Sequence, residues 1–259
     1  MTLEVRATPG FEPAAEALRR ALEARCWRHE GAARLALEID ERGLTLVRDD
    51  RRPALRLHLD FASGRQGYRL AHSGHQREDL IRALGGLPRD SLVVDATAGL
   101  GRDTLLLAAH GFRVHAWERH PVVYHLLADA LDRAGQSAAL AALVRRITLH
   151  EGAADPAGLA EIPAAAVFDP MFPERRKRAA VKKEMQLLQL LLPENPDRDA
   201  EETLTQLRAG VSRRVVVKRP LHAPALGPQP PQASVRGRST RFDIYPSTAG
   251  PAPTPEGGG

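Results

Sequence analysis

A turn with two glycines and two carboxylates is the first feature of this chain that could do chemistry. In DATAGLGRD, Asp95 precedes the turn, Gly99 and Gly101 lie within it, and Asp103 follows it. Glycines let the backbone approach a ligand, and a helix that starts there offers free N–H groups. The dinucleotide pattern G-x-G-x-x-G is incomplete, because Thr104 replaces its third glycine. Carboxylates repel a pyrophosphate but suit the amino and sulfonium groups of S-adenosylmethionine (SAM), the cofactor that we predict.

A further acidic residue stands at the end of the next predicted strand, RVHAWE. Glu118 in that position can bind both hydroxyls of a ribose. Each feature also has a plainer explanation. The two glycines fit an ordinary strand-to-helix turn, Glu118 fits a solvated strand end, and Asp103 fits the first turn of a helix, where a negative charge is favourable. The combination favours a cofactor site.

A third chemical motif follows a later apolar run, AAAVF. Asp169, Pro170 and Phe172 stand in the sequence DPMFP, which resembles the (D/N)PP(Y/F) loop of enzymes that methylate exocyclic amines. The Asp169 carboxylate and the Pro170 carbonyl can accept hydrogen bonds from an amine, and Phe172 can stack on a base. The match is imperfect because Met171 replaces the second proline. The alternative is a tight turn with a hydrophobic plug.

Basic residues cluster after two of the predicted strands. The first cluster directly follows the DPMFP loop, the second ends the strand RRVVVKR, and a third lies near the carboxyl end of the chain. They are Arg175, Arg176, Lys177, Arg178, Lys182 and Lys183; then Lys218 and Arg219; then Arg236, Arg238 and Arg241. Phosphate contacts from such residues would supply sequence-independent affinity for RNA, while the pocket selects the base. The alternative is a solvated charged face.

Strands and helices alternate from Ser91 onwards, and this pattern must position these residues. SLVVD, RVHAWE, ITLH, AAAVFD and RRVVVKR are the strands, separated by helical stretches such as TLLLAAHG and PVVYHLLADALDRAG. This alternation predicts a Rossmann-like α/β fold with a mostly parallel sheet. SVRGRST and RFDIYP then follow with no room for a helix between them, which predicts a terminal antiparallel hairpin. Rossmann-like methyltransferases have such a hairpin, and simple dehydrogenases usually lack it.

The first part of the chain has a different pattern. A helix is expected near 13–28, and the three runs LALEID, LTLVRD and ALRLHLDF alternate apolar and polar residues. Alternation of this kind predicts an antiparallel sheet with one wet face. We predict a small N-terminal α+β domain at 1–75, a methyltransferase domain at 76–246 that opens with a helix near 78–84, and a disordered Pro/Gly-rich tail at 247–259.

Composition narrows the remaining possibilities. Cys26 is the only cysteine, so a disulfide or a cysteine-based zinc site within the chain is excluded. The ten histidines show no metal-ligand spacing, and we expect no metal. No signal peptide or membrane span is expected, which is consistent with a cytoplasmic protein. The net charge of +5 suggests a polyanionic partner.

Several blocks together resemble one known family. DATAGLGRD, WERHPVV, FDPMFPERRKRAAVKKEMQLLQ, RVVVKRP and TRFDIY are similar, in order and spacing, to the small-subunit ribosomal RNA methyltransferase J family. The resemblance covers Ser73 to Pro246. It implies transfer of a methyl group from SAM to the N2 amine of one guanine near the 3′ end of 16S rRNA. The implied partner is 16S rRNA or a small ribosomal subunit particle.

The same resemblance implies individual contacts to the cofactor. By position they fall on Arg102 and Asp103, on Glu118 and Arg119, on Gly152 and Ala153, and on Asp169 beside the methyl group. At Gly152 and Ala153 the family commonly has small hydroxyl residues, and this chain has none. Only backbone or packing contacts to the adenine are possible there.

Three rival functions remain open at this point. The chain could be an N-methyltransferase that acts on another nucleic acid or amine. It could be a non-catalytic RNA-binding protein, which the intact Asp169 and glycine turn argue against. It could also be an NAD-dependent oxidoreductase, which is opposed by the missing third glycine and by the lack of an obvious proton-donor pair.

Overall fold

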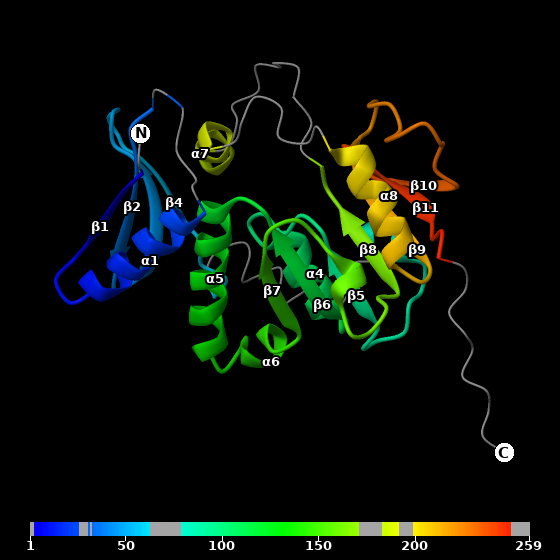
Figure 1. Cartoon of the computed structure of the whole chain (residues 1–259), viewed down its shortest axis with the longest axis horizontal. Helices are drawn as coiled ribbons and strands as arrows, with labels where there is room; N and C mark the ends of the chain where they lie inside the picture. The colour runs from blue at the N-terminus through cyan, green and yellow to red at the C-terminus, as the bar shows by residue number, and fades with distance from the viewer. Residues whose placement is uncertain are drawn as a thin grey trace.

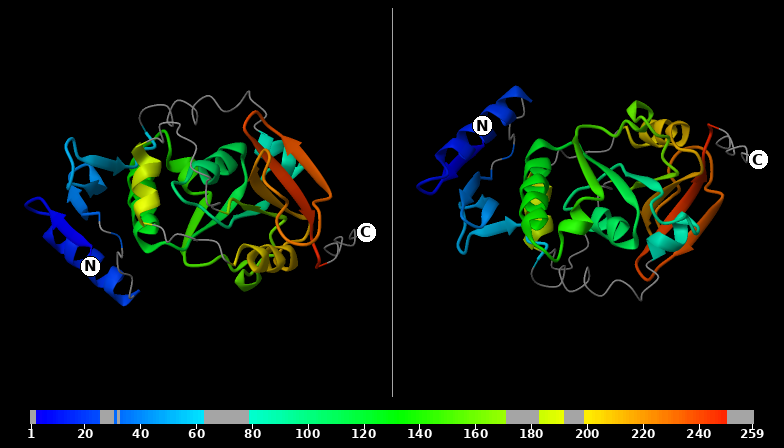
Figure 2. Two further views of the ribbon diagram at one scale, coloured as in Figure 1. Left: turned by 90° about the horizontal axis from the view of Figure 1, so that it is seen from above. Right: turned by 90° about the horizontal axis from the view of Figure 1, so that it is seen from below.

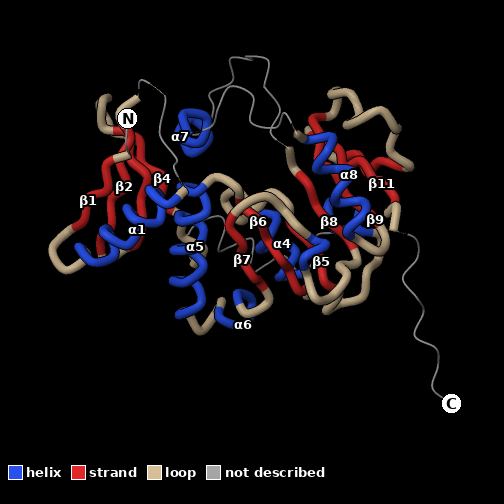
Figure 3. Tube along the Cα trace, in the orientation of Figure 1, coloured by secondary structure: helices blue, strands red, loops and turns tan. Residues whose placement is uncertain are grey.

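The protein contains two β-sheets with the long helix α5 (Pro121–Gln136) between them, as Figure 1 and Figure 3 show. The structure is a computed structural model that describes residues 3–25, 31, 33–62, 79–170, 183–191 and 199–249. The four-stranded sheet near the N-terminus and the hairpin near the C-terminus lie at opposite ends of the molecule (Figure 2).

The larger sheet has seven strands in the order β10-β11-β9-β8-β5-β6-β7. Their bounds are β5 Leu92–Asp95, β6 Arg113–Glu118, β7 Ile147–Glu151, β8 Ala165–Phe168, β9 Arg214–Pro220, β10 Ala233–Arg236 and β11 Thr240–Pro246. The pairs among β5, β6, β7, β8 and β9 are parallel, whereas β11 is antiparallel to both β9 and β10. The predicted parallel sheet that ends in an antiparallel hairpin is confirmed.

Helices cover both faces of this sheet because its strands are apolar on both sides. Val93 belongs to the core on the face of α3 (Asp79–Leu84), α4 (Arg102–His110) and α5. Its neighbour Val94 belongs to the separate core under α8 (Ala200–Gly210). Successive side chains of a strand point to opposite faces, so this alternation assigns each strand residue to one layer. The connections around β7 contain only the short α6 (Ala141–Val144) and the 3-10 turn η1 (Pro156–Gly158).

The smaller sheet is formed by residues from the first part of the chain. Its order is β1-β2-β3-β4, with β1 at Glu4–Ala7, β2 at Leu35–Asp40, β3 at Gly43–Arg48 and β4 at Leu55–His58. The pairs β2–β3 and β3–β4 are antiparallel, as predicted. β1 was not predicted from the sequence and pairs parallel to β2. Helix α1 (Glu12–Ala24) connects these two strands and contacts β1.

The expectation of one wet face is confirmed for this sheet, because the polar residues Glu38, Thr45 and His58 are cross-strand partners and therefore share a face. Arg56 on the same face is exposed and forms an ion pair with Glu38, although Thr45 in the central strand β3 is buried beneath such side chains. Helix α5 packs against β3, and α7 (Lys183–Leu191) packs against β4 and β3. The alternating pattern identified the strands and their wet face, but it could not show that helices from the second half of the chain cover the apolar face, which carries Leu37, Leu46 and Leu57.

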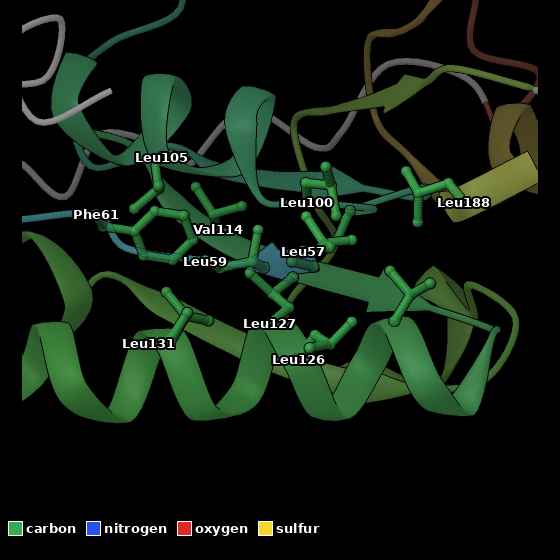
Figure 4. Close-up of a cluster of buried hydrophobic side chains, with 14 of the residues drawn as sticks. Leu57, Leu59, Phe61, Leu100, Leu105, Val114, Leu126, Leu127, Leu131 and Leu188 are labelled. Carbon is green, nitrogen blue, oxygen red and sulfur yellow. The ribbon is translucent and has the colours of Figure 1, made fainter. Parts of the chain in front are cut away.

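One hydrophobic core joins the two sheets. Figure 4 shows Leu57, Leu59 and Phe61 from the N-terminal part facing Leu126 and Leu127 of α5, in a cluster that α4 and α7 also enter. Polar contacts cross the same interface. The Leu44 N–H donates to an Asp129 carboxylate oxygen at 3.1 Å, and the Arg133 guanidinium donates to the Leu59 carbonyl at 2.6 Å. The N-terminal part is therefore packed directly against the sheet that carries the predicted site.

The predicted domain boundary at residues 75–76 lies outside the described residues, as do residues 250–259 of the tail that was predicted at 247–259. The predicted helices agree well with the described ones. α4 ends at Gly111, which has a left-handed φ of 104°, and α5 begins at Pro121. Among the described helices, none combines the length and the apolar composition needed to cross a membrane.

Candidate active site

The carboxyl ends of the five parallel strands lie along one edge of the large sheet. Asp95 ends β5, Glu118 ends β6, Gly152 follows β7 and Asp169 follows β8. Lys218 lies next to this edge on β9, one residue beyond the Phe168–Val217 pair of the β8–β9 ladder. Parallel pairing therefore gathers residues that are far apart in the sequence.

The glycine turn has the backbone conformation that its sequence predicts. Gly99 and Gly101 have φ angles of 53° and 75°, in the region that favours glycine. The Gly101 N–H donates to the Ala98 carbonyl at 2.8 Å. A methyl group on Gly101 would lie 2.6 Å from Leu127 Cδ1 and 3.3 Å from Phe61 Cζ. A methyl group on Gly99 would make only an ordinary van der Waals contact, with the Thr97 carbonyl oxygen at 3.8 Å.

Asp95 stabilises this turn through hydrogen bonds to residues on both sides of the glycines. Its side chain is buried, accepts a hydrogen bond from the Thr104 hydroxyl at 2.6 Å and accepts another from the Thr97 N–H at 3.2 Å. Burial raises the pKa of Asp95 to about 7, although the Thr104 hydrogen bond opposes the rise. The sequence suggested that Asp95 meets the charged part of a cofactor, whereas its described contacts are with the turn and the first helical residues.

Glu118 connects the end of β6 to the glycine turn. One carboxylate oxygen accepts a hydrogen bond from the Gly99 N–H at 2.8 Å, and the other accepts one from the His120 N–H at 2.7 Å. The Gly152 N–H donates to the Glu118 carbonyl at 2.9 Å, which brings the end of β7 alongside. A carboxylate offers about four acceptor positions, and the Gly99 and His120 bonds to Glu118 use one on each of its oxygens.

Asp103, Lys218 and Asp169 form a chain of charges at the centre of the edge. Lys218 Nζ lies 3.0 Å from an Asp103 carboxylate oxygen and 2.8 Å from an Asp169 carboxylate oxygen. The side chains of Asp103 and Lys218 are each 27% exposed, and that of Asp169 is 41% exposed. The pairing was not predicted, because the sequence placed Lys218 among the residues that contact RNA.

Backbone contacts place Asp169 next to the glycine turn. Its N–H donates to the Thr97 hydroxyl oxygen at 2.8 Å, and the Ala96 N–H donates to the Val167 carbonyl at 2.9 Å. Burial raises the pKa of the Asp169 carboxyl, and the Lys218 ammonium opposes this rise. Pro170 is buried, and Phe172 lies outside the described residues. Sequence reasoning missed Thr97, although its position two residues after Asp95 in the turn could have indicated it.

The other predicted cofactor residues surround these groups. Arg102 is exposed at the start of α4. Arg119 is also exposed, and its guanidinium forms an ion pair at 3.0 Å with Asp199. Gly152 has a φ of 114°, and a methyl group there would meet no atom within 4 Å. Ala153 beside it is exposed, so this end of β7 leaves open space next to Glu118.

Most of the predicted RNA-binding residues lie outside the described part of the chain. These are Arg175, Arg176, Lys177, Arg178 and Lys182, while Lys183 begins α7 and its side chain is not described. Arg219 is buried at 2% exposure and donates to the Pro224 carbonyl, so in this structure it cannot reach a phosphate. Arg241 likewise pairs with Asp243 and donates to backbone carbonyls, whereas Arg236 and Arg238 are exposed.

The residues at this edge fit a ligand that carries a ribose and a positive charge. The Glu118 carboxylate is a group to which ribose hydroxyls can donate, and open space lies above Gly152. Asp103 and Asp169 present carboxylates to a cation, a role that Lys218 fills in this structure. SAM has both features, whereas the pyrophosphate of a dinucleotide would face like charges. The described residues contain no group of three or more metal-binding side chains.

Comparison with known proteins gives a consistent result. Residues 21–247 match the model of a family described as "Putative SAM-dependent methyltransferase". The chain is 45% identical to ribosomal RNA small subunit methyltransferase J of Pseudoalteromonas atlantica, over 82% of this chain and 84% of that protein. It is 42% identical to the protein of the same name from Marinobacter nauticus, over 84% of this chain and 80% of that protein.

A solved structure agrees over almost the full length. The SAM-dependent methyltransferase from Neisseria gonorrhoeae matches with a TM-score of 0.69 and 27% sequence identity, covering 95% of this chain and 96% of that one. Three observations therefore indicate a SAM-dependent methyltransferase. They are the fold, the position of the glycine turn at the edge of the sheet, and the sequence identity to these relatives. The chain therefore belongs to the ribosomal RNA small subunit methyltransferase J family of SAM-dependent methyltransferases.

Proposed function

We propose that this enzyme transfers a methyl group from SAM to the exocyclic N2 amine of a guanine in 16S rRNA, in the cytoplasm. The position of Asp169 is the observation that carries this proposal. Its carboxylate follows β8 at the cofactor edge, and its N–H is fixed by the Thr97 hydroxyl at 2.8 Å. An acceptor in that place can orient an amine toward the glycine turn.

Asp169 and Pro170 supply the catalytic contacts in this proposal. The Asp169 carboxylate and the Pro170 carbonyl accept hydrogen bonds from the amine and direct its lone pair. Phe172, outside the described residues, stacks on the target base. SAM supplies a methyl group that its sulfonium already activates. Orientation by the protein therefore accounts for most of the catalysis, and no strong general base is needed.

The cofactor is held by residues from three strand ends. Glu118 binds the ribose hydroxyls, and the backbone at Gly152 and Ala153 borders the adenine. Gly99 and Gly101 allow close approach of the backbone, and Asp95 keeps the turn in shape through Thr97 and Thr104. Three further charged residues complete the proposed cofactor site. They are Arg102, Asp103 and Arg119.

The RNA is held mainly by the basic run that follows the catalytic loop. This proposed surface consists of residues that follow Asp169 within 14 positions of the sequence, namely Arg175, Arg176, Lys177, Arg178, Lys182 and Lys183. Contacts with phosphates give affinity without reading sequence, so the pocket selects the guanine. Because Arg219 is buried and Lys218 is paired with two carboxylates, we leave both out of this surface.

A methyl-transfer assay with product identification tests the proposal. The enzyme is incubated with labelled SAM and either naked 16S rRNA or small ribosomal subunits, both from cells that lack this methylation, and the RNA is digested to nucleosides. N2-methylguanosine is the expected product, and Asp169→Ala is the negative control. Label in a different nucleoside would change the target, and no transfer to either substrate would contradict the proposal.

A further inference from the structure

Lys218 joins two carboxylates that come from separate parts of the fold. Asp103 lies in the first turn of α4, Asp169 follows β8, and Lys218 lies on β9. Its ammonium is 3.0 Å from the first carboxylate and 2.8 Å from the second. The side chain reaches Asp103 because Lys218 lies on the same face of β9 as Val216, whose core includes α4.

The residue type suits this bridging position. Lys177, Lys182, Lys183 and Lys218 are the only lysines in a chain with 37 lysine and arginine residues. An ammonium is a compact charge with three donors, so it can face two carboxylates in different directions. A guanidinium is planar and favours side-by-side pairing with a single carboxylate.

The charges around Asp169 oppose one another. Among the described residues, Lys218 faces it from β9, Asp103 faces it from α4, and Asp95 lies nearby at the end of β5. Burial and the Asp103 charge raise the pKa of Asp169, whereas Lys218 lowers it. Burial lowers the pKa of Lys218, but the two carboxylates more than offset this effect and raise it. Lys218 therefore stays positively charged throughout the neutral range.

We propose that Lys218 is a positioning residue for methyl transfer, because its ammonium holds the Asp169 carboxylate ionised and in a fixed orientation beside Asp103. An ionised carboxylate can only accept hydrogen bonds, which is what the amine of the substrate requires. The inference rests on the proposed function of Asp169. It replaces the expectation from sequence that Lys218 contacts RNA phosphates, since both carboxylates already compete for its charge.

The first test uses the ligand-free protein. Carboxyl carbons of aspartate are labelled with ¹³C, and the Asp169 resonance is identified by its loss in Asp169→Asn. Removing an adjacent cation raises the pKa of a carboxyl by about one unit or more. We expect the Asp169 titration to move upward by that amount in Lys218→Met and to stay in place in Arg145→Met. Arg145 is an exposed control before β7, at the opposite edge of the sheet.

The second test follows methyl transfer against pH at saturating SAM and RNA. In Lys218→Met the pKa that controls the acid limb of the single-turnover rate should rise by the same amount. The rate should therefore fall about fivefold or more at the wild-type midpoint and recover at higher pH. Adding Asp103→Asn removes a like charge and should move the limb back down. Lys218→Arg should keep the acid limb near wild type and turn over more slowly, because its planar group cannot face both carboxylates equally.

The outcomes separate this inference from the proposed function. An unshifted Asp169 titration and acid limb in folded Lys218→Met would overturn the role of Lys218, even if Asp169→Ala is inactive. Activity in Asp169→Ala would instead contradict the assignment of Asp169. If Lys218→Met does not fold, the same comparison is made with Lys218→Arg and Asp103→Asn. Asp103→Asn should then lower both the pKa of Asp169 in the titration and the pKa of the acid limb. If neither value changes, the inference is overturned. A reduced salt dependence of RNA binding with an unshifted titration would return Lys218 to the RNA surface.

Discussion

Phe61 packs directly beneath Gly101, so the end of the N-terminal sheet supports the turn of the cofactor site. A methyl group on Gly101 would lie 3.3 Å from Phe61 Cζ and 2.6 Å from Leu127 Cδ1. Phe61 itself is 1% exposed within the core that joins the two sheets. The shape of the glycine turn therefore depends on a residue about 40 positions earlier in the chain.

Gly101→Ala tests how tightly this turn is packed. The variant has a side chain in a left-handed conformation, which costs about 1–2 kcal/mol. It also overpacks the site against Leu127, which adds about 1–3 kcal/mol. Urea unfolding should show the sum of both losses. Gly86→Ala is the matched control, because Gly86 has a φ of 70° and no atom within 4 Å of the added methyl group. Equal losses in both variants would contradict the close packing.

Glu118→Ala should weaken cofactor binding. The substitution removes the proposed acceptor of the ribose hydroxyls and also releases the Gly99 N–H. Hydrogen bonds to a charged group contribute about 1.5–3 kcal/mol, so calorimetry should show an affinity for S-adenosylhomocysteine about 10 to 100 times lower. Glu161→Ala, an exposed glutamate paired with Arg113, should bind as wild type does. Thermal protection of the wild type by NADH and not by SAM would show that the cofactor is wrong.

Asp169→Ala should separate chemistry from RNA binding. Methyl transfer is lost because the amine has no carboxylate acceptor, while RNA affinity stays nearly unchanged because phosphate contacts carry it. Cofactor affinity is measured separately, since this carboxylate lies in the same charge chain as Lys218 and Asp103. A filter-binding assay and single-turnover methylation are the two measurements. Wild-type methylation by this variant would remove Asp169 from the catalytic role.

Asp95 should make the free energy of unfolding fall as pH rises. Its pKa of about 7 in the folded protein exceeds that of an exposed aspartate, about 3.9. Between these values the folded state binds more protons than the unfolded state, so stability is greatest at the acid side and declines toward pH 7. The decline is at most about 1.4 kcal/mol per pH unit. We compare the free energies of unfolding of wild type and Asp95→Asn, measured with urea from pH 5 to 8. The advantage of wild type over Asp95→Asn should shrink as pH rises. A constant difference would argue against this pKa.

The basic run after the catalytic loop should control the salt dependence of RNA binding. Replacing Arg175, Arg176, Lys177 and Arg178 with alanine removes phosphate contacts, each of which contributes about 0.7–0.9 to the log–log slope. Because not all four need touch a phosphate, we expect a total change of about 2–3. Cofactor affinity should barely move.

A second quadruple variant is the matched control for the basic run. It replaces four arginines at the opposite edge of the sheet, namely Arg89, Arg113, Arg145 and Arg146, which precede or begin β5, β6 and β7. This control should keep the wild-type slope. A wild-type slope in the first variant as well, with folding intact, would mean that the run after the catalytic loop is only a solvated face.

The strands and the glycine turn could be predicted because residues within a few positions of one another determine them. A short run of consecutive apolar residues bounded by polar or turn residues, such as the three in SLVVD, indicates a buried strand wherever the chain later places it. β1 escaped prediction because it has four residues and pairs with β2, about 30 positions away. The helices that cover the apolar face of β3 could not be identified for the same reason, since α5 and α7 come from much later in the chain.

Charged side chains at the active edge show what the sequence by itself determined and what only the tertiary structure decided. The sequence alone placed Glu118, Asp169 and the pair Lys218–Arg219 at strand ends, because strand boundaries follow from local pattern. It could not assign a partner to either basic residue. Neighbours on a strand point to opposite faces, so Lys218 reaches Asp103 and Asp169 while Arg219 turns toward the Pro224 carbonyl. The partners of these two residues depend on the pairing of β8 with β9 and on the position of α4. These three segments are far apart in the sequence and come together only when the chain folds.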